Sequence, residues 1–221
     1  ERRDSTISLQ GLQVRENRGP ICSVSHDLIV DASGRNSKFP KWLGDLGATI
    51  SEEREDAEIV YYTKHYQLKN GQNEPDRTGK NRGAGDLGYI KYGVFPGDNG
   101  HFAIILCLPN HETELRNAVK EPALFDKICE AIPGLEPWVK SGKSKATTNS
   151  FGFGKINAVW RNFVKNDRPA ALNYFAVGDA AVRTNPLYGR GCSTGIVHAH
   201  LLEKAVAENN SPIERALMFE R

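Results

Sequence analysis

The stretch Y-F-A-V-G-D-A-A-V-R-T-N-P-L-Y-G-R-G-C-S-T-G, residues 174–195, decides the fold. Its apolar start predicts a buried strand that ends at Gly178, where a missing side chain lets a ligand approach the backbone. Asp179 then presents a carboxylate at the carboxyl edge of the predicted sheet, where ligands bind in α/β proteins. Glycines 189, 191 and 195 surround the start of a long predicted helix, whose free N–H groups carry partial positive charge. The pattern therefore indicates a site for a flavin or a phosphate.

A purely structural interpretation of the same residues is also open. Ser193 or Thr194 would then be only a helix N-cap, and the glycines would serve close packing of the helix against the sheet. Physical reasoning favours the ligand site over the scaffold without excluding the scaffold.

Outward from this stretch, strand-like and helix-like patterns alternate at both ends of the chain and enclose a sheet-rich middle. The Pro96–Gly100 connection predicts a hairpin, and the apolar stripe of Ile196, Ala199, Leu202 and Val206 predicts a deeply packed last helix. We expect strands at 6–15, 26–32, 57–68, 89–95, 101–108, 155–164 and 172–177, and helices at 38–46, 112–119, 123–131 and 193–207. This order is expected of a mixed α/β chain in which a second domain is inserted into a doubly wound fold.

The composition excludes several function classes. With 29 basic and 27 acidic side chains, the formal charge of +2 offers no field for a nucleic acid partner. The longest apolar runs are strand-length, so no stable membrane insertion is expected. Four cysteines at 22, 107, 129 and 192 form no C-x-x-C pair, which favours a reducing cytoplasm, and Cys107 and Cys129 are predicted to be buried thiols.

Other motifs in the sequence give weaker indications of function. A literal G-x-G-x-x-G at glycines 83, 85 and 88 follows a polar loop and precedes a predicted strand, the reverse of the order that a phosphate cradle needs. His198 and His200 lie two apart on a helix and point to different sides, so no metal site is predicted. No nucleophile and base arrangement is apparent, and the catalytic residues are left unassigned.

With these residues in view, G-D-A-A followed by a proline and a Gly-x-Gly at a helix start resembles the second FAD fingerprint of a flavoprotein superfamily. That superfamily comprises the aromatic hydroxylases, which are p-hydroxybenzoate hydroxylase-like, together with the tryptophan halogenases and the geranylgeranyl reductases. The resemblance implies that Asp179 hydrogen-bonds a ribityl hydroxyl of FAD and that the segment 186–195 borders the isoalloxazine ring. The cofactor-binding residues that it implies here are Gly178, Asp179, Pro186, Gly189, Arg190, Gly191 and Cys192.

A second segment, D-L-I-V-D-A-S-G-R-N-S at 27–37, is similar to the superfamily's other internal motif. The backbone turn at Gly34 and the hydroxyl of Ser37 are implied to serve the cofactor. Ser33 and Pro40 depart from the Asp and the Arg that are usual there, and Val182 departs from a frequent His. The resemblance therefore implies no contact from the Ser33 or Pro40 side chain to the pyrophosphate or to a nicotinamide cofactor, and Ala-Ser-Gly at 32–34 shifts the subgroup toward halogenases and reductases.

The resemblance implies an FAD-binding domain at 1–55 and 166–221 and a sheet-rich substrate-binding domain at 56–165. It implies a monooxygenase that uses reduced FAD, O2 and a small organic substrate, with NADPH as a candidate electron donor. A geranylgeranyl-reductase-like enzyme or a halogenase is the alternative. An inactive fragment is another, because the chain starts without the N-terminal dinucleotide-binding motif. Residues that could line a substrate pocket are Tyr61, Tyr62, His65, Tyr66, Trp160 and Arg161. The sequence does not specify an oligomeric state.

Overall fold

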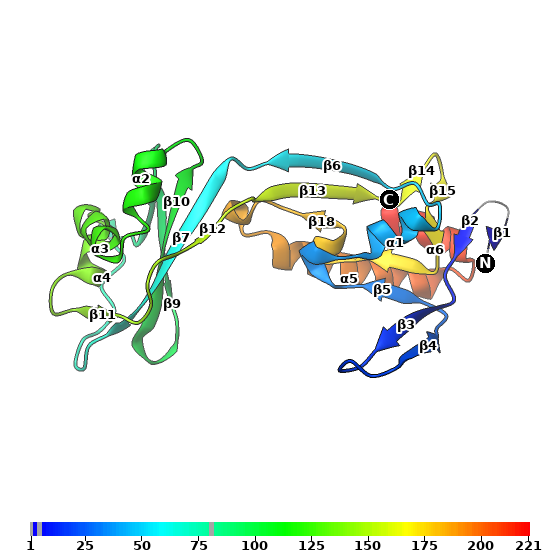
Figure 1. Cartoon of the computed structure of the whole chain (residues 1–221), viewed down its shortest axis with the longest axis horizontal. Helices are drawn as coiled ribbons and strands as arrows, with labels where there is room; N and C mark the ends of the chain where they lie inside the picture. The colour runs from blue at the N-terminus through cyan, green and yellow to red at the C-terminus, as the bar shows by residue number, and fades with distance from the viewer. Residues whose placement is uncertain (1, 4–5, 80–81) are drawn as a thin grey trace. The chain divides into compact units, whose positions relative to one another are not determined.

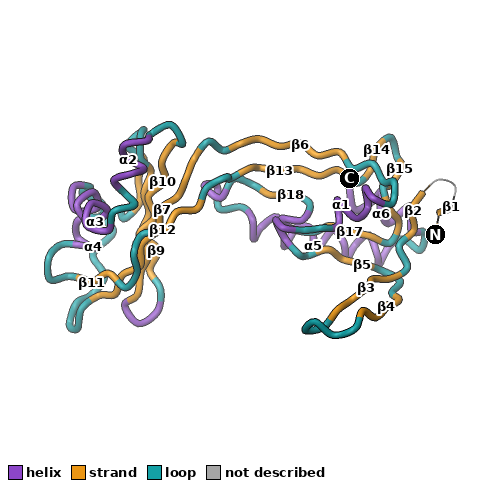
Figure 2. The backbone as a smooth tube through the Cα atoms, in the orientation of Figure 1, coloured by secondary structure: helices purple, strands orange, loops and turns teal. Residues whose placement is uncertain are grey.

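The computed structural model describes residues 2–3, 6–79 and 82–221. The chain divides into two compact units. Unit 1 comprises Glu1–Asp56 and Asn157–Arg221, and unit 2 comprises Ala57–Ile156. Figure 1 colours the elements of both units by their position along the chain, and Figure 2 colours them as helix, strand or loop.

Unit 1 contains short strands in several small sheets. β5 and β17 form a parallel pair, β2 is parallel to β16 and antiparallel to β1, and β13 lies between β18 and β6 in an antiparallel sheet. The two remaining pairs, β3–β4 and β14–β15, are antiparallel hairpins. The strands are β1 (Arg2–Arg3), β2 (Thr6–Ser8), β3 (Gly11–Arg15), β4 (Ile21–Ser25), β5 (Ile29–Asp31), β6 (Ser51–Asp56), β13 (Asn157–Asn162), β14 (Val164–Lys165), β15 (Arg168–Pro169), β16 (Ala171–Leu172), β17 (Tyr174–Ala176) and β18 (Val182–Arg183).

The strand, turn and helix predicted near residues 26–46 are confirmed. β5 is followed by the 3-10 turn η1 (Gly34–Asn36) and by α1 (Phe39–Asp45), which has a proline in its first turn. The turns η4 (Gly178–Ala180) and η5 (Pro186–Tyr188) lie between β17 and the long helix α5 (Gly191–Glu208). The last helix is α6 (Pro212–Glu220), capped by the Ser211 hydroxyl.

Helix α5 packs less deeply than its sequence predicts. Leu201 and Leu202 contact the small core around Phe175, but Ile196 is 70% exposed and Val206 is 39% exposed. The prediction of a deeply packed stripe is therefore wrong for Ile196, Ala199 and Val206. The physical reason is that the neighbours of α5 among the described elements, chiefly η4 and α6, cover only part of its circumference.

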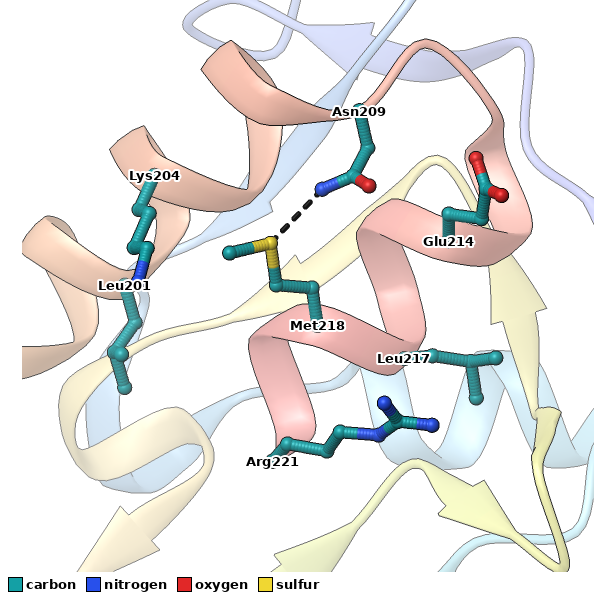
Figure 3. A pocket seen from close by; sticks show the side chains of 7 residues that line it. All are labelled: Leu201, Lys204, Asn209, Glu214, Leu217, Met218 and Arg221. Carbon is teal, nitrogen blue, oxygen red and sulfur yellow. Dashed lines mark hydrogen bonds between the residues drawn. The ribbon is translucent and has the colours of Figure 1, made fainter.

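Helices α5 and α6 border a pocket of about 550 Å³. Figure 3 shows Lys204 from α5 and Met218 from α6 at its wall, with Asn209 between the helices. The amide nitrogen of Asn209 donates to the Met218 sulfur at 2.9 Å and to the carbonyl of Ala205 at 3.2 Å. These bonds fix the turn between the two helices.

Unit 2 is a six-stranded antiparallel sheet with short helices on one face (Figure 1). The predicted hairpin is confirmed, since β9 pairs with β10 and Asn99 and Gly100 adopt positive φ in the connection. The elements are β7 (Ile59–Leu68), β8 (Ala84–Asp86), β9 (Lys91–Pro96), the turn η3 (Asp98–Gly100), β10 (His101–Pro109), α2 (Thr113–Ala118), α3 (Pro122–Ala131), α4 (Glu136–Val139), β11 (Ser144–Ala146) and β12 (Phe151–Phe153).

The core of unit 2 lies between the sheet and its helices. Leu106, Phe125 and Trp138 are fully buried there, and Cys129 belongs to the same cluster. Cys107 is buried as well, so the predicted burial of both thiols is confirmed. Gly88 leads into a turn and then β9 rather than a helix, so the predicted order of loop and strand around glycines 83, 85 and 88 is confirmed. Among the described residues, no helix is long and apolar enough to cross a membrane.

Candidate functional site

The two sequence motifs meet at one edge of the β5–β17 pair. Phe175 lies opposite Val30 and Ala176 opposite Asp31, and the amide of Val177 donates to the carbonyl of Asp31 at 3.0 Å. Because the strands are parallel, both carboxyl ends reach the same edge. The turns η1 and η4, which follow the two strands, are in contact there.

The backbone at Gly178 explains why a glycine ends this strand. Its φ is +56°, a left-handed conformation that favours glycine. A Cβ at this position would lie 3.9 Å from the Cα of Gly195 in α5, so the strand end and the helix approach closely. The amide of Gly178 donates to Nδ1 of His198, 2.9 Å away. His198 thus ties α5 to the start of the Gly-Asp turn.

His198 is therefore explained by a backbone contact, whereas His200 is exposed. In the part of the chain that the structure describes, no three His, Cys, Asp or Glu side chains are grouped to hold a metal ion.

We expect the bond between His198 and Gly178 to contribute less to the stability of unit 1 in mild acid than at neutral pH. Burial lowers the pKa of His198 below its ordinary value of 6.5, so the folded state favours the neutral ring that accepts this bond. The contribution is present above pH 6.5 and is lost as the pH falls through the lower, folded-state pKa. Loss of the bond costs about 1 kcal/mol.

Thermal unfolding between pH 8 and pH 5 measures this effect. His198→Asn offers an acceptor that does not protonate, so the variant should lose less stability over this interval than the wild type does. Equal losses in the two proteins would contradict the assigned role of His198.

Asp179 lies half-buried in η4, at the start of the loop that leads to α5. Among the described residues it has no hydrogen bond and no ion pair within 4 Å, although it attracts the nearby guanidinium of Arg183. A Cβ added to Gly191, at the start of α5, would lie 3.7 Å from the Asp179 carboxylate. The absence of that side chain keeps the carboxylate accessible from the start of the helix.

The loop between Asp179 and α5 is open. Gly189 has a φ of +62°, and a Cβ added at Gly189, Gly195 or Gly34 would meet no atom within 4 Å. Pro186, Arg190 and Cys192 are exposed along the same segment. Among the described residues, no side chain comes within 4 Å of these three Cβ positions, so the backbone there can be approached closely.

Ser37 has a structural partner. Its hydroxyl donates to Oδ2 of Asp31 and accepts from the amide of Phe39 at 3.2 Å, at the start of α1. Asp31 is 1% exposed and also accepts bonds from Ser33 and from the hydroxyl of Tyr174. The carboxylate therefore organises the turn at Gly34, a role that the sequence did not reveal.

A buried arginine supports the Gly-Asp turn from behind. NH1 of Arg161 donates to the carbonyl of Ala180 at 2.8 Å, and its Nε donates to Glu52 at the same distance. The sequence suggested Arg161 only as a residue of a substrate pocket. Its partner Glu52 lies 109 positions away, in a strand with no apolar residue, so no local pattern indicates this ion pair. Trp160, its neighbour, points to the other face and is 53% exposed.

The four aromatic candidates of β7 divide between two faces of the unit 2 sheet. Tyr62 and Tyr66 belong to the core beneath the helices, which removes them as pocket candidates. Tyr61 and His65 lie on the other face, where the His65 ring stacks on Phe151 at 5.7 Å. Phe151, Phe153 and Phe95 share this face through the strand register, and all three are exposed.

The fold defines a class of proteins. The mixed α/β structure matches the fold of FAD-dependent halogenases and monooxygenases over about 95% of the chain. The matches reach only about half of those longer chains.

Particular solved structures illustrate the likeness. The myxobacterial chondrochloren halogenase CndH matches with a TM-score of 0.67 and 17% identity, over 96% of this chain and 47% of its own. The flavin-dependent brominase Bmp2 matches with a TM-score of 0.61 and 16% identity, over 95% and 51%. HpxO of Klebsiella pneumoniae, solved with FAD and uric acid, matches with a TM-score of 0.57 and 14% identity, over 96% and 50%.

One curated relative is similar in sequence. Protein Rv3254 of Mycobacterium tuberculosis is 25% identical over 204 residues, which cover 89% of this chain and 40% of the relative. The chain thus spans less than half of that protein's length. No protein-family model matches the chain.

Proposed function

We propose that this chain is part of an FAD-dependent oxidoreductase, most closely a monooxygenase that hydroxylates a small organic substrate with reduced flavin and O2. The observation that carries the proposal is the accessible carboxylate of Asp179 beside the open, glycine-lined start of α5. The shared fold with flavin-dependent enzymes supports it. The site residues that we assign to FAD are Gly178, Asp179, Pro186, Gly189, Arg190, Gly191, Cys192, Gly34 and Ser37.

The residues present fit a flavin. A carboxylate without an ion pair among the described residues can accept a ribityl hydroxyl, and the space beside Gly189 and Gly195 admits a flat ring close to the backbone. The first N–H groups of α5 have no side-chain cap, so they can stabilise negative charge on a ligand. The Ser37 hydroxyl donates its proton to Asp31, so it can contribute to FAD binding only as an acceptor.

When bound, FAD would supply electron transfer from NADPH and reaction with O2. The chain's own contribution is to bind and orient. His198 fixes the backbone at Gly178, Arg161 holds Ala180, and Asp179 is thereby presented at a defined position. The dipole of α5 provides preorganised positive charge, which is an electrostatic form of catalysis.

The open face of the unit 2 sheet is our candidate surface for the substrate. Tyr61, His65, Phe95, Phe151 and Phe153 make it aromatic. Stacking on such a face suits a planar organic molecule and excludes water.

We expect Asp179→Ala to release flavin. The test uses the chain within the longer protein whose length its relatives suggest, purified with FAD, desalted and measured by flavin absorbance. Loss of a charge-assisted hydrogen bond should weaken FAD binding by about tenfold or more. Asp27→Ala, which removes an exposed carboxylate of the same unit, is the matched control. Equal flavin content in the two variants would remove the ribityl role of Asp179.

The reaction class is tested on the same protein. NADPH oxidation that depends on both O2 and an added phenol supports a monooxygenase. Reduction of an alkene without O2 would replace the monooxygenase with the reductase alternative. A product whose formation depends on halide would replace it with the halogenase alternative. A full-length protein that binds no FAD would favour the inactive class.

A further inference from the structure

The antiparallel sheet β18–β13–β6 gathers three arginines on one of its faces. Arg183, Val159 and Arg54 lie in one row across the three strands, and Arg161 faces Glu52 in the next row on the same side. Val159 and Arg161 are buried in the central strand, Arg183 is half-buried and Arg54 is exposed on the β6 edge. Three cations therefore share one face, which is buried at its centre and open at the β6 edge.

One carboxylate serves two of these arginines. Glu52 accepts from NH2 of Arg54 at 2.6 Å and from Nε of Arg161 at 2.8 Å. Both guanidinium groups hold the pKa of Glu52 below its ordinary value against the effect of burial, which raises it. Glu52 and Asp56 are the two carboxylates of β6 on this side, so the three arginines of the face outnumber them by one.

Arg183 is the cation that the protein leaves incompletely paired. Its Nε donates to the carbonyl of Asn157 at 2.7 Å, which orients the guanidinium. Within residues 6–79 and 82–221, no carboxylate forms a salt bridge with Arg183 and no acceptor binds its two terminal nitrogens. Arg183 lies half-buried in β18, shortly after the Gly-Asp turn, and it interacts electrostatically with Asp179 of that turn, so its guanidinium lies near the site.

The charges around Arg183 are mainly of its own sign. Its pKa is lowered first by burial and then by Arg35, Arg161 and Arg54, and only Asp179 opposes this effect. A cation held by the fold among cations is stabilised when an anion binds, because the repulsion is then relieved.

We propose that Arg183 and the arginine-lined face of the β18–β13–β6 sheet bind the anionic group of a ligand, a carboxylate or a phosphate. The planar guanidinium offers two parallel N–H donors, which match the two oxygens of such a group. Partial burial strengthens the pairing relative to a surface arginine. The site lies beside Asp179, so a carboxylate would belong to an acidic substrate and a phosphate to a nucleotide cofactor.

The experiment uses the 221-residue chain without flavin, so that its outcome is independent of the flavin proposal. The arginine Nε–H signals are followed by NMR while sodium pyrophosphate, sodium benzoate or neutral benzamide is added at constant ionic strength. We expect a saturable shift of the assigned Arg183 signal with one of the two anions, with a Kd on the order of 1 mM, and none with benzamide. Pyrophosphate identifies a phosphate ligand and benzoate an organic acid.

Two variants carry the matched comparison. Arg183→Gln should weaken binding of that anion by about tenfold, the loss of one charge-assisted pair. Arg168→Gln removes the same charge from an exposed arginine of unit 1 and should leave the affinity unchanged. Equal affinities in the two variants, or an Arg183 signal that neither anion shifts, would overturn the proposal. The wild-type signal remains a direct readout if Arg183→Gln does not fold.

Discussion

Asp126→Ala is expected to lower the free energy of unfolding of unit 2 by about 2–4 kcal/mol, because it leaves a buried ammonium group without its counter-ion. Lys64 is 2% exposed, and its Nζ lies 2.8 Å from each oxygen of Asp126 and 3.0 Å from the carbonyl of Pro122. The Tyr66 hydroxyl donates to the same carboxylate at 2.6 Å. Two buried donors thus depend on one side chain of α3.

Lys64→Met should behave differently. It removes the cation together with its need for a partner, and a methionine of similar length fills the space among Tyr66 and Phe125. Replacing a buried charge with a well-packed apolar side chain is often neutral or stabilising, so a change within about 1 kcal/mol is expected. The double variant should recover most of the stability that Asp126→Ala loses.

Urea unfolding followed by the fluorescence of Trp138 measures these effects within unit 2, where this indole is fully buried. Trp42 and Trp160 belong to unit 1 and are about half exposed, so both are replaced by phenylalanine in the background protein. If Asp126→Ala and Lys64→Met shift the midpoint of urea unfolding equally, the Asp126 carboxylate does not offset the cost of burying the Lys64 ammonium group.

The fold was predictable where local pattern and burial agree. β7, β10, α3 and the β9–β10 hairpin follow from β-branched alternation, a first-turn proline and residues that tolerate positive φ. β6 was missed, because S-E-E-R-E-D carries no apolar residue and its pairing with β13 depends on a distant strand. The exposure of Ile196 was missed because an apolar stripe predicts a covered face without specifying what covers it.

The candidate site divides in the same way. The Gly-Asp turn and the glycine-lined start of α5 were identified from the sequence, since both follow local rules of strand ends and helix starts. The residues that position them were not. His198 binds Gly178 across 20 positions, and Arg161 reaches Ala180 from another strand. Such partners come together only through tertiary contacts, so the spacing of residues within one segment does not predict them.

Asp31→Ala is expected to destabilise unit 1 by about 3–5 kcal/mol, because several donors lose their acceptor at once. The carboxylate is 1% exposed and accepts from the amide and hydroxyl of Ser33, from the hydroxyl of Ser37 and from Tyr174. The Tyr174 ring is buried as well, so water cannot readily replace the lost acceptor.

Single-donor variants provide the comparison for Asp31→Ala. Tyr174→Phe removes a donor together with its need for an acceptor and should cost about 1 kcal/mol. Hydrogen exchange reports the local consequence, since the amide of Ser33 should exchange much faster in Asp31→Ala, whereas the amides of α6 should exchange faster only in proportion to the loss of global stability. If Asp31→Ala costs no more than Tyr174→Phe, the turn at Gly34 is held by backbone contacts alone. The buried carboxylate would then lack the organising role that links the motif at 27–37 to the edge where Asp179 lies.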